Sequence, residues 1–133
     1  MKSANYLKIG WVLPGILTFA FFFSSCRKEP VLAPGTELVC FNQKVLPVLQ
    51  SHCATSGCHD AGGESPQFSS YDDVKSLVKA GNPNKSKLYN VITSKGLVLT
   101  TMPPKGSTEL SVKNINDITV WILQGATNDT TCH

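Results

Sequence analysis

Residues 53–59 read Cys53-Ala54-Thr55-Ser56-Gly57-Cys58-His59, so four residues separate two cysteines and a histidine directly follows the second. The shorter pattern Cys-x-x-Cys-His is the usual attachment signature of haem c, in which both thiols bond to the haem and the adjacent imidazole binds its iron. The spacer residues are small, and Gly57 can adopt backbone angles that other residues resist, so the spacer can bulge outward. The segment predicts a covalent haem on Cys53 and Cys58, with His59 as an axial ligand.

Two other interpretations of this cluster stay open. His52, Cys53, Cys58 and His59 are four potential zinc ligands, although zinc sites usually combine ligand pairs from separate elements. A disulfide between Cys53 and Cys58, with no cofactor, is the second alternative.

A second axial ligand is expected further along the chain. Met102 lies 43 residues after His59 and is the only methionine besides Met1. Its loop is polar and rich in proline, where a lone methionine is hard to explain as core packing. Pro103 biases Met102 toward extended backbone, and a thioether stabilises reduced haem iron. We therefore expect Met102 to bind the iron opposite His59, with His133 as a weaker competitor.

The first 25 residues have the pattern of an export signal. Lys2 and Lys8 come before a 15-residue apolar run at 9–23. This run is shorter than the roughly 20 residues of a membrane span. The run ends in Ser24-Ser25-Cys26, which resembles a bacterial lipobox. We expect Cys26 to be acylated and to become the mature N-terminus. An uncleaved anchor helix is the alternative.

We expect the chain to have three parts: the signal peptide at 1–25, the lipidated cysteine and a tether at 26–39, and a folded domain at 40–133. An acyl anchor binds a lipid bilayer, so we expect an exported lipoprotein of the cell envelope, on the periplasmic face of a membrane. The chain has 12 basic and 9 acidic residues, and without the two leader lysines its net charge is +1. The basic residues form no block, which argues against a nucleic-acid partner.

The cysteines number five, and an odd count needs an explanation. Once Cys26 is assigned to lipid and the pair in the motif to haem, Cys40 and Cys132 remain, one at each end of the folded domain. An oxidising compartment favours a disulfide between them. It would close a loop of roughly 90 residues and stabilise the domain by up to about 4–5 kcal/mol on the chain-entropy account.

Apolar spacing predicts a small all-α domain. Helices are expected over residues 41–51, over 71–79, from Pro83 through Ile92, and from Ser111 to Gly125. Pro47 must kink or begin the first helix, and Ser70 with Asp73 forms a plausible capping box for the second. Residues 97–100 are compatible with a short extended piece.

Five segments then follow one another in a recognisable order. They are Val45-Leu46-Pro47-Val48-Leu49, Ser56-Gly57-Cys58-His59-Asp60, Gly81-Asn82-Pro83-Asn84-Lys85-Ser86-Lys87-Leu88-Tyr89, Met102-Pro103-Pro104 and Trp121-Ile122-Leu123-Gln124-Gly125-Ala126. Together they resemble the small c-type cytochrome domains of Bacteroidetes lipoproteins, related to the planctomycete-type cytochrome c domain. The resemblance implies a cytochrome c-like fold whose first and last helices cross near the haem. It also implies haem attachment at Cys53 and Cys58, axial ligation by His59 and Met102, and a packing role for Trp121.

The expected function is electron transfer by one covalently bound haem c, rather than catalysis. An electron carrier needs redox protein partners, but the resemblance does not supply one, so these partners are not identified. A haem enzyme such as a peroxidase is one alternative, which would need a displaceable sixth ligand and nearby acid–base groups. A structural or sensing module in an envelope complex is the other.

Overall fold

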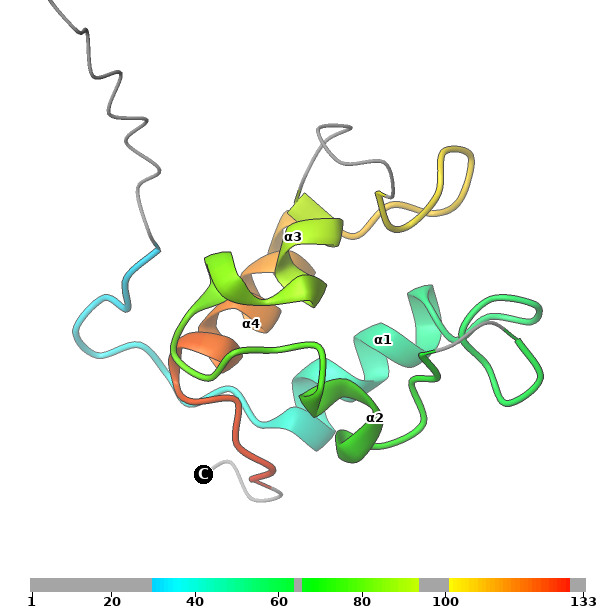
Figure 1. Cartoon of the computed structure of the whole chain (residues 1–133). Helices are drawn as coiled ribbons and strands as arrows, with labels where there is room; N and C mark the ends of the chain where they lie inside the picture. The colour runs from blue at the N-terminus through cyan, green and yellow to red at the C-terminus, as the bar shows by residue number, and fades with distance from the viewer. Residues whose placement is uncertain (1–29, 64–65, 94–100, 130–133) are drawn as a thin grey trace, which may run out of the picture.

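The computed structural model describes residues 30–63, 66–93 and 101–129, which fold into helices joined by turns, with no strand among them (Figure 1). The elements are a π-helical turn η1 (Phe41–Val45), α1 (Leu46–His52), α2 (Tyr71–Lys75), a 3-10 turn η2 (Pro83–Lys85), α3 (Lys87–Thr93) and α4 (Val112–Leu123). The prediction of an all-α domain is confirmed for this part of the chain. None of the described helices is long and apolar enough to cross a bilayer. The predicted signal peptide, Cys26 and the possible extended piece at 97–100 lie outside the described residues.

The first predicted helix forms, but in two parts. A π-helical turn leads into α1, and Pro47 lies in the first turn of α1. Proline has no N–H to donate to a carbonyl four residues earlier, so it is best placed at a helix start. The two parts share one buried face, made by Phe41, Val45 and Leu49.

Three aromatic rings join this face to the other end of the domain. The ring centroid of Phe41 lies 5.2 Å from that of Trp121 on α4 and 5.3 Å from that of Tyr71 at the start of α2. The polar groups of Trp121 and Tyr71 both donate to backbone carbonyls of the chain after α4. Trp121 Nε1 donates to the carbonyl of Thr127 at 2.9 Å, and the Tyr71 hydroxyl donates to the carbonyl of Ala126 at 2.8 Å. Buried aromatics of this kind contribute strongly to a small core. They fix α1, α2 and α4 relative to one another.

The second predicted helix has the expected capping box between Ser70 and Asp73, but it ends at Lys75 and not near residue 79. The chain leaves α-helical geometry directly after Lys75: the N–H of Leu77 donates to the carbonyl of Val74 at 2.9 Å and that of Val78 to the carbonyl of Lys75 at 3.4 Å, each three residues earlier. The backbone N–H of Lys79 then donates to the hydroxyl of Ser86 at 2.8 Å. The third predicted helix is likewise divided at Ser86 into η2 and α3.

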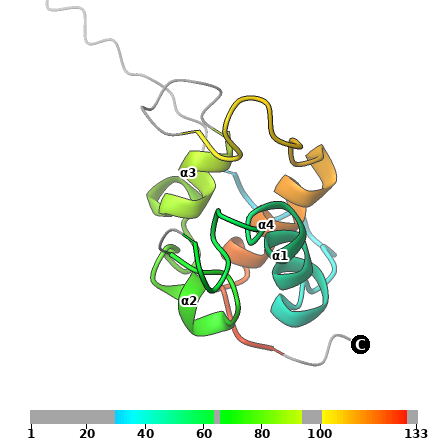
Figure 2. The ribbon, with the colours of Figure 1, turned by 90° about the vertical axis from the view of Figure 1, so that its right-hand side faces the viewer.

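The last predicted helix is confirmed at both ends. The Ser111 side chain accepts a hydrogen bond from the N–H of Asn114 at 3.1 Å, which is an N-cap. Gly125, with φ of 103°, follows the C-terminus of the helix. The apolar face of α4, including Ile118 and Ile122, packs against η1 and α3. In Figure 2, α2 and α3 lie on one side and α1 on the other, with α4 between and behind them.

The connection between α2 and α3 depends on one buried hydroxyl. Ser86 is fully buried, and its hydroxyl also donates to the carbonyl of Asn82 at 2.9 Å. Replacing it with alanine (Ser86→Ala) leaves the N–H of Lys79 without its partner, and we expect a loss of about 1–3 kcal/mol in the free energy of unfolding, measured by urea denaturation. The matched change at exposed Ser76 (Ser76→Ala) should cost less than about 0.5 kcal/mol. Equal losses at the two serines would contradict this account.

Candidate functional site

A cavity of about 560 Å³ opens between the end of α1 with its following loop, α3, and the loop that leads to α4. This volume is typical of sites for small molecules and cofactors. Cys53, Cys58, His59 and Met102 all line it. The four residues predicted from the sequence to hold a haem are therefore brought together around one space.

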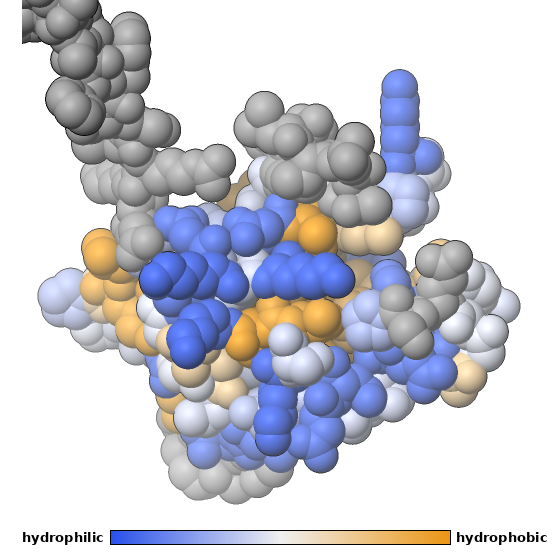
Figure 3. Space-filling view, in the orientation of Figure 1, coloured by the Kyte–Doolittle hydropathy of each residue, from blue (hydrophilic) through white to orange (hydrophobic). Residues whose placement is uncertain are grey.

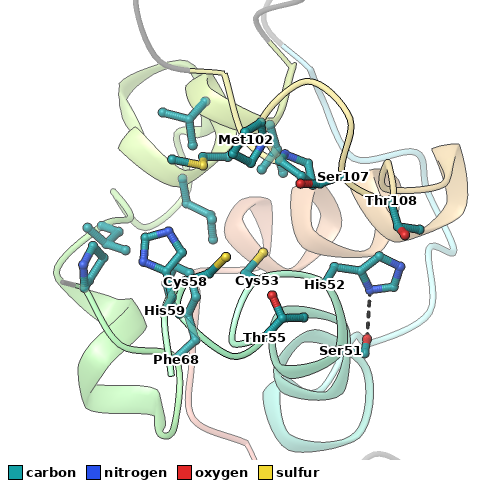
Figure 4. Close-up of a pocket in the computed structure, with 18 of the residues that line it drawn as sticks. Ser51, His52, Cys53, Thr55, Cys58, His59, Phe68, Met102, Ser107 and Thr108 are labelled. Carbon is teal, nitrogen blue, oxygen red and sulfur yellow. Dashed lines mark hydrogen bonds between the residues drawn. The ribbon is translucent and has the colours of Figure 1, made fainter. Parts of the chain in front are cut away.

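The two predicted axial ligands lie on different walls of this cavity. Figure 4 shows Met102 on one side, and Cys53, Cys58 and His59 on the other. The backbone N–H of Met102 donates to the carbonyl of Val91 at 2.9 Å, which fixes the start of the methionine loop to the end of α3.

The four-residue spacer forms a closed turn. The N–H of His59 donates to the carbonyl of Cys53 at 3.1 Å, and the N–H of Cys58 donates to that of Thr55 at 2.9 Å. Gly57 has a φ of +81°, in the region that favours glycine. The turn returns Cys58 and His59 to the neighbourhood of Cys53. The expectation of a spacer that bulges outward holds only in part, because Thr55 and Gly57, although exposed, also line the cavity.

The imidazole of His59 has an aromatic neighbour that the sequence analysis did not identify. The ring of buried Phe68 lies 4.9 Å from the His59 ring, centroid to centroid. The N–H of Phe68 also donates to the carbonyl of His59 at 3.1 Å. Phe68 therefore positions both the main chain and the ring of His59. The sequence offers little sign of this role of Phe68. Residues 60–70 have no helical periodicity, so the only signal was the position of Phe68 shortly after the motif.

The two thiols of the motif are both free, so the structure does not contain the alternative Cys53–Cys58 disulfide. Cys53 is only 7% exposed, whereas Cys58 is exposed to solvent. Burial raises the pKa of the Cys53 thiol to about 11, and the charge of a Cys58 thiolate adds to this rise.

The zinc alternative finds no geometric support in the described chain. Among these residues, no three histidine, cysteine, aspartate or glutamate side chains form a group that could hold a metal ion. His52, one of the four candidates, lies at the end of α1, with Nδ1 3.1 Å from the carbonyl oxygen of Val48 and 2.8 Å from the hydroxyl of Ser51.

The rest of the cavity wall is mainly apolar. Three side chains of α3 and one from the segment after α2 supply this surface: Leu88, Val91, Ile92 and Leu77. Ser51, Ser107 and Thr108 gather with His52 toward one end (Figure 4). Lys87, at the start of α3, is the one lysine or arginine among the described lining residues.

The structure describes only one of the two cysteines in the predicted Cys40–Cys132 disulfide. Cys40 is fully buried beside η1 and is disulfide-bonded. Its predicted partner, Cys132, lies outside the described residues, as does His133, so the Cys40–Cys132 pairing stays a prediction.

No protein-family model, no curated protein and no solved structure matches this chain. We therefore interpret the site from its own residues and geometry.

Gly63 is required where the chain folds back on the motif. A Cβ at this position would overlap the carbonyl oxygen of Cys58 and come close to Oδ1 of Asp60, which is buried without a hydrogen-bond partner among the described residues. We expect Gly63→Ala to lower the free energy of unfolding by roughly 1–3 kcal/mol, measured by urea denaturation, because the backbone of the motif must move. Gly62→Ala is the matched control, since its Cβ would meet nothing within 4 Å. Similar stabilities for the two variants would refute this packing.

The two thiols should differ in reactivity in the chain without haem. Below pH 11 the Cys53 thiol remains mostly protonated, and only the thiolate is nucleophilic. We expect iodoacetamide to alkylate Cys58 first, and the rate at Cys53 to rise by about tenfold per pH unit up to about pH 11, as peptide mass spectrometry would show. In denaturant the two cysteines should react alike. Equal rates in the folded chain would contradict the burial of Cys53.

Proposed function

We propose that this chain is a c-type cytochrome that holds one haem c on Cys53 and Cys58 and carries electrons in the cell envelope. One observation supports this most directly. The two thiols, the adjacent His59 and the distant Met102 line the same cavity, with Met102 across from the motif (Figure 4).

The cavity fits the chemistry of a haem. The group is flat and largely apolar, with carboxylates at one edge, and the wall from α3 is apolar with Lys87 beside it. Two thiols are present for the covalent bonds, and an imidazole and a thioether for the iron. When bound, the haem supplies a one-electron couple. The spacer turn closed by the His59 N–H and the Cys53 carbonyl supports attachment despite the unusual spacing.

The contribution of the chain is to hold and orient these groups. Phe68 fixes His59, and the hydrogen bond to the Val91 carbonyl fixes Met102. Contacts behind the ligands of a metal commonly set their orientation. The apolar side chains of α3 would keep water away from a bound haem, and a thioether ligand favours the reduced state of haem iron.

Met102 also favours an electron carrier over the alternatives. A peroxidase requires an open or displaceable position opposite the histidine, together with acid–base groups. Here the wall facing the motif carries a thioether whose main chain is anchored to α3. A structural or sensing module is the remaining alternative, and it would not require paired thiols and two iron ligands around one cavity.

The proposed location follows from the sequence. Export, acylation of Cys26 and a Cys40–Cys132 disulfide are mutually consistent, since disulfides persist outside the cytoplasm. We propose an exported lipoprotein anchored in a bilayer, on the periplasmic side, whose partners are redox proteins.

Replacing Met102 tests the assignment of the second ligand. We expect Met102→Ala to remove the far-red methionine–iron charge-transfer band of the oxidised protein, to lower the reduction potential, and to allow rapid carbon monoxide binding, all measured by absorption spectroscopy. Thr108→Ala, on the same loop and lining the same cavity, should leave the band in place. An unchanged spectrum and potential in Met102→Ala would show that Met102 is not a ligand.

A further inference from the structure

The predicted tether is attached to the domain over its described part. We call residues 30–39 the strap. The side-chain amide of Gln124, just after α4, binds the strap twice: Oε1 accepts from the N–H of Val39 at 2.9 Å, and Nε2 donates to the carbonyl of Glu37 at 2.8 Å. Toward the N-terminal end of the strap, Val31 and Leu32 line a groove whose other wall is formed by residues of α4. The strap therefore has a defined position on α4 and is not a free linker there.

Most of the exposed large hydrophobic side chains of the described chain belong to the strap. Large hydrophobic side chains are exposed at four described positions, and three of them are in the strap: Val31 at 81%, Leu32 at 38% and Leu38 at 47%. Its one charged residue is Glu37. Orange surface at the left edge of Figure 3, beside the start of the described chain, shows this apolar side. Exposed apolar side chains grouped in one short segment suit a contact with a partner or a membrane.

The short chain between Cys26 and the strap favours a lipid bilayer as the surface that the strap contacts. Pro30 is four residues after Cys26, so the connecting chain reaches at most about 14 Å. An acylated Cys26 would therefore keep the strap within reach of the lipid headgroups. Arg27 and Lys28 lie between them in sequence, and their positive charges would be attracted to an anionic bilayer.

We propose that the strap rests on the bilayer surface through Val31, Leu32 and Leu38 and holds the domain in one orientation. This rests on the acylation and the haem of the proposed function. Figure 1 shows the strap on the left of the fold, whereas the end of α1 and the methionine loop, which line the cavity, lie on the right. The cavity is thus turned away from the lipid, toward a redox partner in the aqueous phase.

Binding to the bilayer and orientation on it come from different interactions. The acyl chains supply affinity, since two or more bind a bilayer stably. The Gln124 hydrogen bonds and the strap side chains transmit the position of the anchor to α4. Without these bonds, a linker of about ten flexible residues would let the domain rotate freely.

The test uses the full-length, acylated, haem-loaded protein in oriented multilayers of anionic phospholipid. Electron paramagnetic resonance of the oxidised haem reports the tilt of the haem relative to the membrane. We expect a spectrum that changes with sample angle, and at least a twofold loss of this angular dependence in Gln124→Ala and in Val31→Ser/Leu32→Ser. Val112→Ser is the matched control, because Val112 is an 86% exposed valine outside the strap, and it should behave as the wild type.

An angle-independent wild-type spectrum from membrane-bound protein would overturn the inference. Failure of the proposed function would look different, because the haem signal itself would be absent, and failure of acylation would leave the protein unbound. Hydrogen exchange provides a readout that does not need haem. Strap amides should exchange at least several-fold more slowly when the protein is bound to vesicles, and equal rates with and without vesicles would also contradict the proposal.

Discussion

The site depends on one backbone hydrogen bond, from the N–H of His59 to the carbonyl of Cys53. It closes the four-residue spacer into a turn, and so places the second thiol and the imidazole beside the first thiol. Without this closure a longer spacer would separate the groups that the proposed attachment requires. Gly57, with its positive φ, and Gly63, against which the Cys58 carbonyl packs, allow the chain to turn so tightly.

The rest of the fold supplies the opposite wall. Packing of Phe41, Tyr71 and Trp121 fixes the first and last helices against each other, and the buried hydroxyl of Ser86 sets the position of α3. The hydrogen bond from Met102 to Val91 then places the methionine loop across from the motif. The proposed iron ligands are thus positioned by separate parts of one core, although they are 43 positions apart in sequence.

Local signals in the sequence were good predictors of local structure. The caps at Ser70 and Ser111 and the helix stop at Gly125 form as expected, because they depend on neighbouring residues alone. The chain path after α2 was not predictable from neighbouring residues, because the N–H of Lys79 donates to the hydroxyl of Ser86 in the following segment. Phe68 and Gln124 were missed for the same reason: their partners are set by the tertiary fold. The grouping of Cys53, Cys58, His59 and Met102 around one cavity agrees with the motif, while the haem itself stays a proposal.

The central claim is tested most directly by mass spectrometry of the mature protein, purified from the membranes of a host with haem c maturation machinery. The account predicts a chain heavier by one haem, with the haem retained under denaturing conditions on the peptide that contains Cys53 and Cys58. It also predicts acylation at Cys26 and a bond between Cys40 and Cys132. A mature chain without haem mass, with both motif thiols free to react with an alkylating reagent, would contradict it.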